Sequence, residues 1–273
     1  MERLKDKIAI IGSGNIGSAI AEGLLDAKII SANKLTLTKR KLETLGKFEN
    51  KGVKISSDNI DAVKNSSIII LAVTPQKMDF VLDEIKDYIN PKKHLILSII
   101  TGAEIIHFKE KLGENVQVVR VMPNTAIAIK ESMTCISANH EDEHALKTAE
   151  IIFNTVGKTA IINEDLMIPA TALVACGIAF FLRAIRAAGQ GGTEIGFHAE
   201  DAIKLAAQTA KGAASLLANG GFHPEREIDK VTTPQGLTIT GLNQMEHHGF
   251  SSAMITGIVS SAKRAETIFK KEK

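Results

Sequence analysis

The chain has 273 residues, of which 44% are hydrophobic and 23% charged, and its formal net charge at pH 7 is +2. This composition is that of a globular protein with one large or two modest domains, and the small net charge gives no support for binding nucleic acid or an anionic membrane. A chain with one tyrosine and no tryptophan also lacks an aromatic platform for stacked bases. Residues 1–7 are charged and lead directly into an expected strand, so we expect no signal peptide, no membrane-spanning segment and a cytoplasmic location.

The first part of the chain alternates short, β-branched apolar segments with helical patterns. Most of these apolar segments are continuous, as in parallel strands that are covered on both faces. We therefore expect an α/β fold with a doubly wound sheet and right-handed crossovers. The expected strands are 8–11, 34–38, 53–55, 68–73, 94–100 and 117–121, with 132–137 and 158–162 extending the sheet, and the expected helices are 15–25, 59–64, 77–88, 104–111 and 141–154.

Strand patterns stop near Asn163, which divides the chain into an expected sheet domain at 1–162 and an all-helical domain at 163–273. Residues 168–182 carry almost no charge, so their helix must be buried on most sides. We favour an obligate dimer in which a partner subunit covers this helix, and burial against the sheet domain alone is the alternative. The expected helices are 166–189 and 199–219, with shorter ones after Pro224, Gly236 and Phe250.

A Gly-x-Gly-x-x-Gly sequence follows the first expected strand and opens the first expected helix. In this context the pattern predicts a dinucleotide site. Gly12 permits the tight turn, Gly14 lets a pyrophosphate approach the backbone, and Gly17 allows the helix to pack closely on the strand. Asn15 and Ile16 complete the loop and are expected to lie against the cofactor.

The end of the second expected strand indicates which dinucleotide binds. An NAD-preferring site usually has Asp or Glu there, to accept hydrogen bonds from the ribose 2′-hydroxyl. This chain has Thr38, which can bond a phosphate, followed by the cations Lys39 and Arg40. The sequence therefore favours NADPH, with NADH possible, and the alternative is a solvated basic start of a surface helix.

Two further loops lie at the carboxyl ends of expected strands, where ligands of open α/β sheets bind. Ala72, Val73, Thr74 and Pro75 end the fourth strand, beside the expected adenosine end of the cofactor. Asn124 ends the sixth, near the expected nicotinamide ring, where it either bonds the carboxamide or simply caps a turn.

In the helical half, Pro234 and Gly236 interrupt the helical pattern and a new apolar period begins at Leu237. Unpaired backbone N–H groups at such a helix start suit a carboxylate or phosphate. The alternative is an ordinary helix–helix turn capped by threonine. No cluster of His, Cys and carboxylate residues has metal-ligand spacing, so we expect no metal.

With these residues in place, the chain resembles the pyrroline-5-carboxylate reductase family nearly end to end. The resemblance is carried by the glycine loop, the basic turn after the second strand, and the segments 71–76 (LAVTPQ), 120–125 (RVMPNT), 207–214 (AQTAKGAA), 223–224 (HP) and 233–238 (TPQGLT), the last of which falls on the signature turn of the family.

The resemblance implies a Rossmann-like N-terminal domain, a helical C-terminal dimerisation domain that often assembles into rings of dimers, and a substrate pocket between subunits. The backbone amides of Gly236, Leu237 and Thr238 would hold the substrate carboxylate, and the Thr238 hydroxyl would face the ring nitrogen. Asn59 matches a position near the adenosine ribose, and Gly102 lies in a loop bordering the cofactor.

The chain departs from the family pattern at several positions. Gln235 stands where the family usually has Gly, and Ala126 stands where Pro commonly follows Thr125. Residues 174–180 lack a usual Pro and Tyr, which predicts a more regular long helix, and the usual Lys is absent at Thr74. These changes concern the substrate pocket more than cofactor binding.

The expected activity is NADPH-dependent reduction of pyrroline-5-carboxylate to proline, the last step of proline biosynthesis. The imine carbon is electrophilic, so the enzyme mainly has to orient the substrate, and no ionisable general acid is evident. A related NADP-dependent reductase of another imine or keto acid is the first alternative. A non-catalytic nucleotide-binding regulator is the second.

Overall fold

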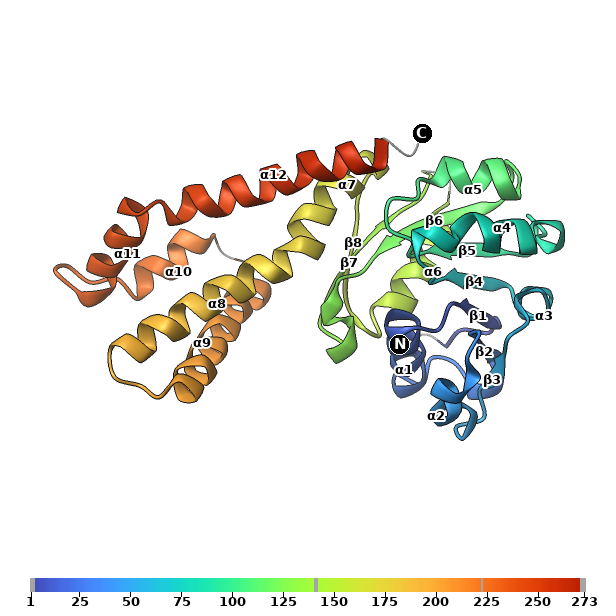
Figure 1. Cartoon of the computed structure of the whole chain (residues 1–273), viewed down its shortest axis with the longest axis horizontal. Helices are drawn as coiled ribbons and strands as arrows, with labels where there is room; N and C mark the ends of the chain where they lie inside the picture. The colour runs from blue at the N-terminus through green and yellow to red at the C-terminus, as the bar shows by residue number, and fades with distance from the viewer. Residues whose placement is uncertain (1–2, 140–141, 222, 271–273) are drawn as a thin grey trace. The chain divides into compact units, whose positions relative to one another are not determined.

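The computed structural model describes residues 3–139, 142–221 and 223–270 and divides into two compact units (Figure 1). Unit 1 comprises Met1–Ala175 and Ala265–Lys273, and unit 2 comprises Cys176–Arg264. The two units differ in their secondary structure. Unit 1 is a sheet covered by helices, and unit 2 is helical throughout its described residues.

Unit 1 contains an eight-stranded sheet in the order β3-β2-β1-β4-β5-β6-β7-β8. Strand order runs outward in both directions from β1 and β4, which confirms the predicted doubly wound sheet and puts the ligand crevice at the carboxyl ends of these central strands. β1 to β6 pair in parallel, β7 is antiparallel to β6, and β8 is parallel to β7. The strands are β1 (Ile8–Ile11), β2 (Leu35–Thr38), β3 (Lys54–Ser56), β4 (Ile68–Leu71), β5 (Leu95–Ser98), β6 (Gln117–Met122), β7 (Ser132–Ser137) and β8 (Gly157–Ile161).

Helices cover both faces of the sheet because its central strands are apolar on both sides. In β1, Ile8 and Ile10 join the core under one set of helices, and Ala9 and Ile11 join the core under the other. The first set is α1 (Asn15–Asp26), α2 (Gly46–Glu49) and α6 (Glu143–Phe153), and the second is α3 (Asn59–Lys64), α4 (Met78–Ile85) and α5 (Ile105–Leu112). The expected helix at 141–154 begins, in the described residues, at Glu143; residue 141 lies outside them.

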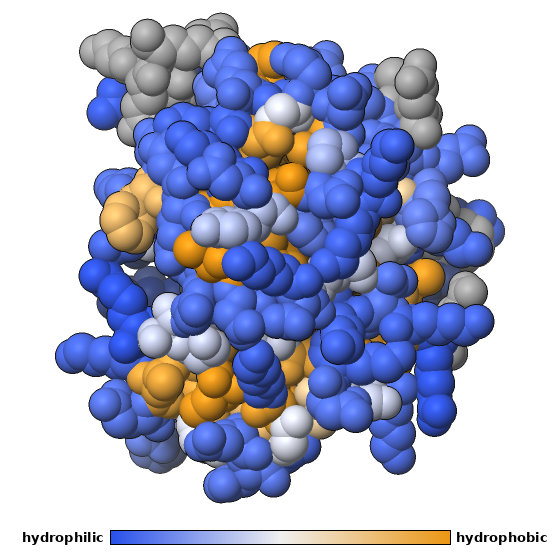
Figure 2. Space-filling view, turned by 90° about the vertical axis from the view of Figure 1, so that its right-hand side faces the viewer, coloured by the Kyte–Doolittle hydropathy of each residue, from blue (hydrophilic) through white to orange (hydrophobic). Residues whose placement is uncertain are grey.

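Polar side chains dominate the face of the protein drawn in Figure 2. Figure 2, which views the right-hand side of Figure 1, shows polar residues over most of this face and hydrophobic ones gathered in the recesses between them. With Phe48, Phe108 and Phe153 all fully buried, unit 1 encloses a core of its own.

His94, just before β5, gives unit 1 a pH-dependent stability. Its ring is 2% exposed, and burial, together with the charge of Lys93, lowers its pKa below the ordinary value. As the pH falls below about 6.5, the unfolded chain takes up a proton that the folded chain does not. We expect the free energy of unfolding to fall with pH in this range, by up to about 1.4 kcal/mol per pH unit.

Denaturant unfolding between pH 7 and pH 5 measures this slope. Asn90 N–H donates to His94 Nδ1 at 3.0 Å, and a His94→Asn variant keeps an acceptor there while removing the titration. Its slope should be shallower than that of the parent, whereas the exposed His248→Asn change should leave the slope in place. Equal slopes in all three proteins would contradict the assignment.

The change from strands to helices comes after β8, as expected, and the compact units divide between Ala175 and Cys176. The reason is that the first helical turns pack on the sheet domain. Met167 and Ala172 are 1% exposed, and Glu164 accepts a hydrogen bond from the backbone N–H of Ile105 at 2.7 Å.

The expected continuous helix at 166–189 is not one regular α-helix. It consists of α7 (Met167–Ala170), a π-helical turn at Thr171–Cys176 and α8 (Gly177–Glu194). The Thr171 hydroxyl donates to the Met167 carbonyl at 2.9 Å, one turn back. Such back-bonding competes with the regular backbone ladder, and the prediction of a more regular helix here was wrong.

Unit 2 contains the rest of the helices. α8 and α9 lie side by side (Figure 1), and at their contact a Cβ on Gly189 would come within 2.8 Å of the Ile203 side chain. The last helix is longer than expected. The helices are α9 (Ala199–Gly220), α10 (Pro224–Lys230), α11 (Leu237–His247) and α12 (Phe250–Lys270).

Unit 2 has almost no interior of its own. Among its described residues only Gly177, Gly189 and Ala202 are buried. An apolar cavity of about 890 Å³ opens along α8 and α9 and reaches Met245 and Phe250. Glu164–Glu194 is also, within the described part of the chain, the one helical stretch that length and composition alone would allow to cross a membrane. Helices that pack on other protein helices pass the same test.

Candidate functional site

The glycine loop after β1 has a conformation that requires glycine at two positions. Gly12 has φ +92°, and a Cβ there would lie 2.7 Å from the Ala72 carbonyl oxygen. A Cβ on Gly17 would lie 2.9 Å from the Gly12 carbonyl oxygen, so Gly17 serves close packing of helix on strand. Backbone N–H groups of Gly12 and Ser13 donate to the Thr38 carbonyl at 3.2 and 2.9 Å. These bonds hold the loop beside the end of β2.

The N-terminus of α1 offers backbone donors to an anion. The first backbone bond of the helix is donated by Ser18 to Gly14 at 2.9 Å, so the N–H groups of Asn15, Ile16 and Gly17 precede the intrahelical ladder. No side chain caps this helix, and its first turn has no acidic residue. A Cβ on Gly14 would meet nothing within 4 Å, so the backbone is open to a ligand here.

A cavity of about 390 Å³ opens beside this loop and collects most of the residues that the sequence nominates for the cofactor. The nominated residues that line it come from the glycine loop, the end of β2, the start of α3 and the end of β4. They are Gly12, Gly14, Thr38, Lys39, Arg40, Asn59, Ala72, Val73 and Thr74. The structure thus brings nine dispersed positions to one edge of the sheet.

Three polar or aromatic residues of this cavity were missed by the sequence analysis: Ser57, Lys77 and Phe80. Ser57 directly follows β3, and Lys77 and Phe80 belong to the loop and helix that follow β4. Their place after the carboxyl ends of strands is the signal that could have found them. Lys77 matters most, because it supplies a positive charge in the cavity that Thr74 does not.

Thr38 lines the cavity, and its hydroxyl has a partner within the protein. It is 1% exposed, and its hydroxyl donates to Asn59 Oδ1 at 2.7 Å. The hydroxyl hydrogen is therefore directed to the protein. The cations Lys39 and Arg40 line the cavity next to Thr38.

A second, smaller cavity of about 50 Å³ lies at the ends of β5 and β6 and contains Ile16 and Gly102. Arg120 also lines it, which the sequence analysis did not anticipate. Arg120 is 5% exposed, and burial lowers its pKa below the ordinary value while Glu164, at 3.6 Å, opposes that shift. The pair ties the start of the helical region to this edge of the sheet.

Asn124 acts as a cap rather than an open donor. It is 7% exposed, its Oδ1 accepts from the backbone N–H of Ala126 at 3.0 Å, and its Nδ2 donates to the Val174 carbonyl at 3.4 Å. Of the two alternatives at this position, the geometry matches the turn cap. Asn124, Asn15 and Pro75 are not among the residues that line the two cavities.

The turn before α11, at residues 233–236, is tight. The Gly236 N–H donates to the Thr233 carbonyl at 2.9 Å, and Gln235 has φ +59°, a left-handed conformation that favours glycine. A Cβ on Gly236 would lie 2.3 Å from Thr233 Oγ1. Gly236 is therefore required by the geometry, and Gln235 adopts the strained position that the family usually fills with Gly.

The start of α11 is open. Gly236 is its N-cap, no side chain caps it, and its first turn has no acidic residue, so the structure does not show the threonine-capped turn of the alternative interpretation. Leu237 is 94% exposed and Thr238 is exposed beside it. The free N–H groups of a helix start of this kind can bind an anionic group.

Comparisons with known proteins agree with this geometry. Residues 7–102 match the model of the family described as NADP oxidoreductase, coenzyme F420-dependent, and residues 164–268 match that of pyrroline-5-carboxylate reductase dimerisation. Pyrroline-5-carboxylate reductase 2 of Dictyostelium discoideum is 45% identical over 94% of this chain and 91% of its own length. The reductase of Methanosarcina acetivorans is 35% identical over 97% and 98%.

Pyrroline-5-carboxylate reductase 1 of Dictyostelium discoideum is 50% identical over 98% of this chain, which spans about half, 51%, of that relative's length. Among solved structures, a pyrroline-5-carboxylate reductase from Coxiella burnetii matches with a TM-score of 0.92 and 28% identity over 97% of this chain and 98% of its own. The Plasmodium falciparum enzyme, solved with NADP bound, matches with a TM-score of 0.84 and 26% identity over 98% and 99%. This chain therefore belongs to the pyrroline-5-carboxylate reductase family.

Proposed function

We propose that the protein reduces pyrroline-5-carboxylate to proline with NADPH. The observation that carries this proposal is the pair of open helix starts in a chain of this family: α1 beside a basic cavity in unit 1, and α11 behind the tight Gly236 turn in unit 2. The first suits the phosphates of a dinucleotide, and the second suits the carboxylate of a small substrate.

The residues of unit 1 fit NADPH. The uncapped α1 N-terminus offers donors for the pyrophosphate, and the space beyond Gly14 is open. The cavity that follows holds Lys39, Arg40 and Lys77 and has no Asp or Glu among its lining residues, which suits a ribose 2′-phosphate better than a 2′-hydroxyl. When bound, NADPH supplies the hydride for the reduction.

The chain's own contribution to the reaction is orientation. Backbone N–H groups of Leu237 and Thr238 hold the substrate carboxylate, which fixes the ring. The Gly236 N–H, which the family resemblance also nominates, is donated to the Thr233 carbonyl and shapes the turn instead. The Thr238 hydroxyl hydrogen-bonds the ring nitrogen, which carries a proton as the carbon–nitrogen double bond is reduced. With the substrate bound as its protonated iminium, no ionisable side chain has to transfer a proton.

Replacing Thr238 with alanine tests this role. We expect kcat with pyrroline-5-carboxylate to fall about 10- to 100-fold, because the hydrogen bond that orients the ring nitrogen, and with it the adjacent carbon that accepts the hydride, is removed. Thr238→Ser keeps the hydroxyl and should stay within about threefold of the parent. Normal turnover by Thr238→Ala in steady-state assays would remove the assigned role.

Arg40 gives a test of the cofactor assignment. An Arg40→Ala variant should raise KM for NADPH by about tenfold and change KM for NADH little, because only NADPH carries the 2′-phosphate that the guanidinium contacts. Lys41 is the adjacent cation but does not line the cavity, so Lys41→Ala is the matched control. Equal loss with both coenzymes would contradict 2′-phosphate recognition by Arg40.

We also propose that two copies associate through the helices of unit 2 as a homodimer, with larger assemblies built from it. The support is the near absence of buried residues in the described part of unit 2, the apolar cavity along α8 and α9, and the match of residues 164–268 to a dimerisation model. A partner subunit would cover the exposed Leu205 and Phe181.

Both cysteines are free thiols, which supports the proposal of a reducing, cytoplasmic location.

A further inference from the structure

The Asn59 amide, at the start of α3, lies between a hydroxyl and a carboxylate. Its Oδ1 accepts from the Thr38 hydroxyl at 2.7 Å, and its Nδ2 donates to Glu84 Oε2, on α4, at 2.8 Å. Asn59 and Thr38 both line the cavity beside the glycine loop, and Glu84 is not among its lining residues. The three side chains thus form a chain of hydrogen bonds that ends outside the cavity.

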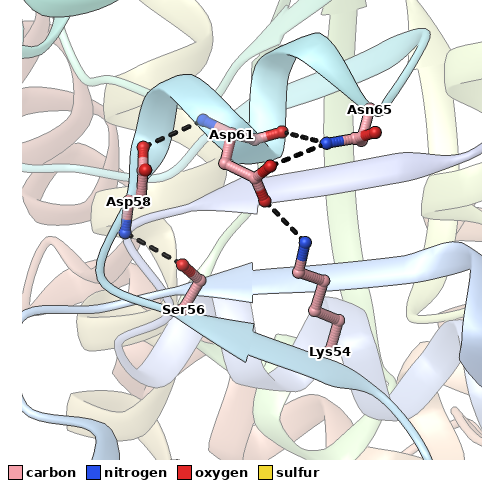
Figure 3. A network of polar contacts seen from close by, with 5 residues as sticks. All are labelled: Lys54, Ser56, Asp58, Asp61 and Asn65. Atoms are coloured by element: carbon pink, nitrogen blue, oxygen red, sulfur yellow. Dashed lines mark hydrogen bonds and ion pairs between the residues drawn. The ribbon is translucent and has the colours of Figure 1, made fainter.

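The backbone that carries Asn59 is fixed by a polar network next to it (Figure 3). Ser56 Oγ accepts from the Asp58 N–H at 3.0 Å, and Asp58 Oδ1 accepts from the Asp61 N–H at 2.9 Å. Lys54 Nζ donates to Asp61 Oδ2 at 2.5 Å, and this bond lowers the pKa of Asp61. These bonds hold the first turn of α3, and the orientation of the Asn59 amide is set by its own partners, Thr38 and Glu84.

Thr38 and Glu84 differ in how strictly they fix the orientation of the Asn59 amide. A threonine hydroxyl can donate or accept, so Thr38 satisfies the amide in either orientation. An ionised carboxylate only accepts, so Glu84 is satisfied only when Nδ2 faces it. Glu84 therefore determines which end of the amide faces Thr38, and the hydroxyl hydrogen of Thr38 follows.

We propose that Glu84 is a positioning residue for the coenzyme, acting through Asn59. With one Nδ2 hydrogen donated to Glu84, Asn59 keeps its second Nδ2 hydrogen as the group it offers to the cavity. The adenosine half of the coenzyme, with its ribose oxygens and 2′-phosphate, presents acceptors to that donor. The inference rests on the proposed use of this cavity for NADPH.

Glu84→Gln removes this directional control without changing the size of the side chain, because an amide can donate as well as accept. We expect the Kd for NADPH, measured by coenzyme fluorescence, to rise about fivefold, which corresponds to the loss of one hydrogen bond. The value of kcat at saturating NADPH should stay within twofold. Asp83, next to it on α4, pairs with Lys111 and Lys86 on the surface, so Asp83→Asn is a charge-matched control that should leave Kd unchanged.

Two further measurements separate positioning from general damage. Binding of 2′,5′-ADP, which carries only the adenosine end, should weaken by the same factor in Glu84→Gln, while the rate with reduced nicotinamide mononucleotide should not change. In the double variant Asn59→Asp with Glu84→Gln, the new amide at position 84 can donate to the new carboxylate at position 59, and the Thr38 hydroxyl can still donate to that carboxylate. Both bonds can therefore re-form without a hydrogen left for the cavity, so this variant should fold with the parent's Tm and still bind 2′,5′-ADP weakly.

Parent-like binding of 2′,5′-ADP by either variant would overturn the positioning role, as would equal weakening by Asp83→Asn. Failure of the parent protein to bind NADPH would be a different result, since it would remove the proposed function itself. If the Glu84→Gln protein did not fold, the double variant would still test the polarity of Asn59.

Discussion

Replacing Gly236 with alanine is expected to lower kcat/KM for pyrroline-5-carboxylate by about 100-fold while the chain stays folded. A Cβ at this position would lie 2.3 Å from Thr233 Oγ1 and 2.8 Å from the Thr233 carbonyl oxygen. The Thr233 hydroxyl can rotate away, but the backbone oxygen cannot. The turn must therefore open, which displaces the N–H groups that hold the substrate carboxylate.

The effect of Gly236→Ala on stability should be small in comparison, because the turn lies in a part of unit 2 without buried side chains. Gly241→Ala, one turn further along α11, is the matched control, since a Cβ there meets nothing within 4 Å. It should raise stability slightly through better helix propensity and leave kcat/KM unchanged. Full activity of Gly236→Ala would exclude this turn as the carboxylate site.

The second large effect is expected at the glycine loop, where two substitutions should act differently. Gly12→Ala forces a side chain into φ +92° with a backbone oxygen 2.7 Å away, so it should lower the free energy of unfolding by about 3 kcal/mol and abolish NADPH binding. Gly14→Ala meets no protein atom within 4 Å and has an ordinary φ of −79°. It should stay within about 0.5 kcal/mol of the parent in stability.

Despite its normal stability, Gly14→Ala should weaken NADPH binding by about tenfold or more, because the methyl group occupies open space where the pyrophosphate approaches the backbone. Chemical denaturation and coenzyme titration measure the two effects separately. Gly46→Ala, at the start of α2 and outside the cavity, is an equally open position that should change neither quantity. Unchanged coenzyme binding in Gly14→Ala would contradict the assigned site.

The contrast between these glycines shows what the sequence can predict. The spacing of Gly12, Gly14 and Gly17 after an apolar strand specifies a backbone path, and the strand order of the sheet follows from alternating strand and helix patterns. The Rossmann-like fold, the helical second half and the break before α11 were all predictable on that basis. Each depends on local sequence that is read over a few residues.

Side-chain pairing could not be predicted in the same way, because it depends on residues far apart in the chain. Thr38 has a hydroxyl suited to a phosphate, but this hydroxyl donates its hydrogen bond to Asn59, twenty-one residues later. Asn124 could have met a carboxamide, but Ala126 and Val174 engage its amide. In both cases the tertiary fold supplies a protein partner that competes with the ligand.

The sequence patterns also did not predict the antiparallel direction of β7 or the π-helical turn before α8. Lys77, at the end of η3 (Pro75–Lys77), brings a positive charge to the cavity that Thr74 also lines. These features leave the two proposed binding places unchanged: the basic cavity in unit 1, proposed for NADPH, and the open start of α11 in unit 2, proposed for the substrate carboxylate.

The central claim is that the chain turns over pyrroline-5-carboxylate with NADPH. The most direct test is a steady-state assay of the purified full chain with a panel of cyclic imine carboxylates and keto acids, following NADPH consumption and product together. We expect NADPH oxidation to be fastest with pyrroline-5-carboxylate and to yield one proline per NADPH. Tight NADPH binding without oxidation by any imine acid, or faster turnover of a different imine or keto acid, would contradict it.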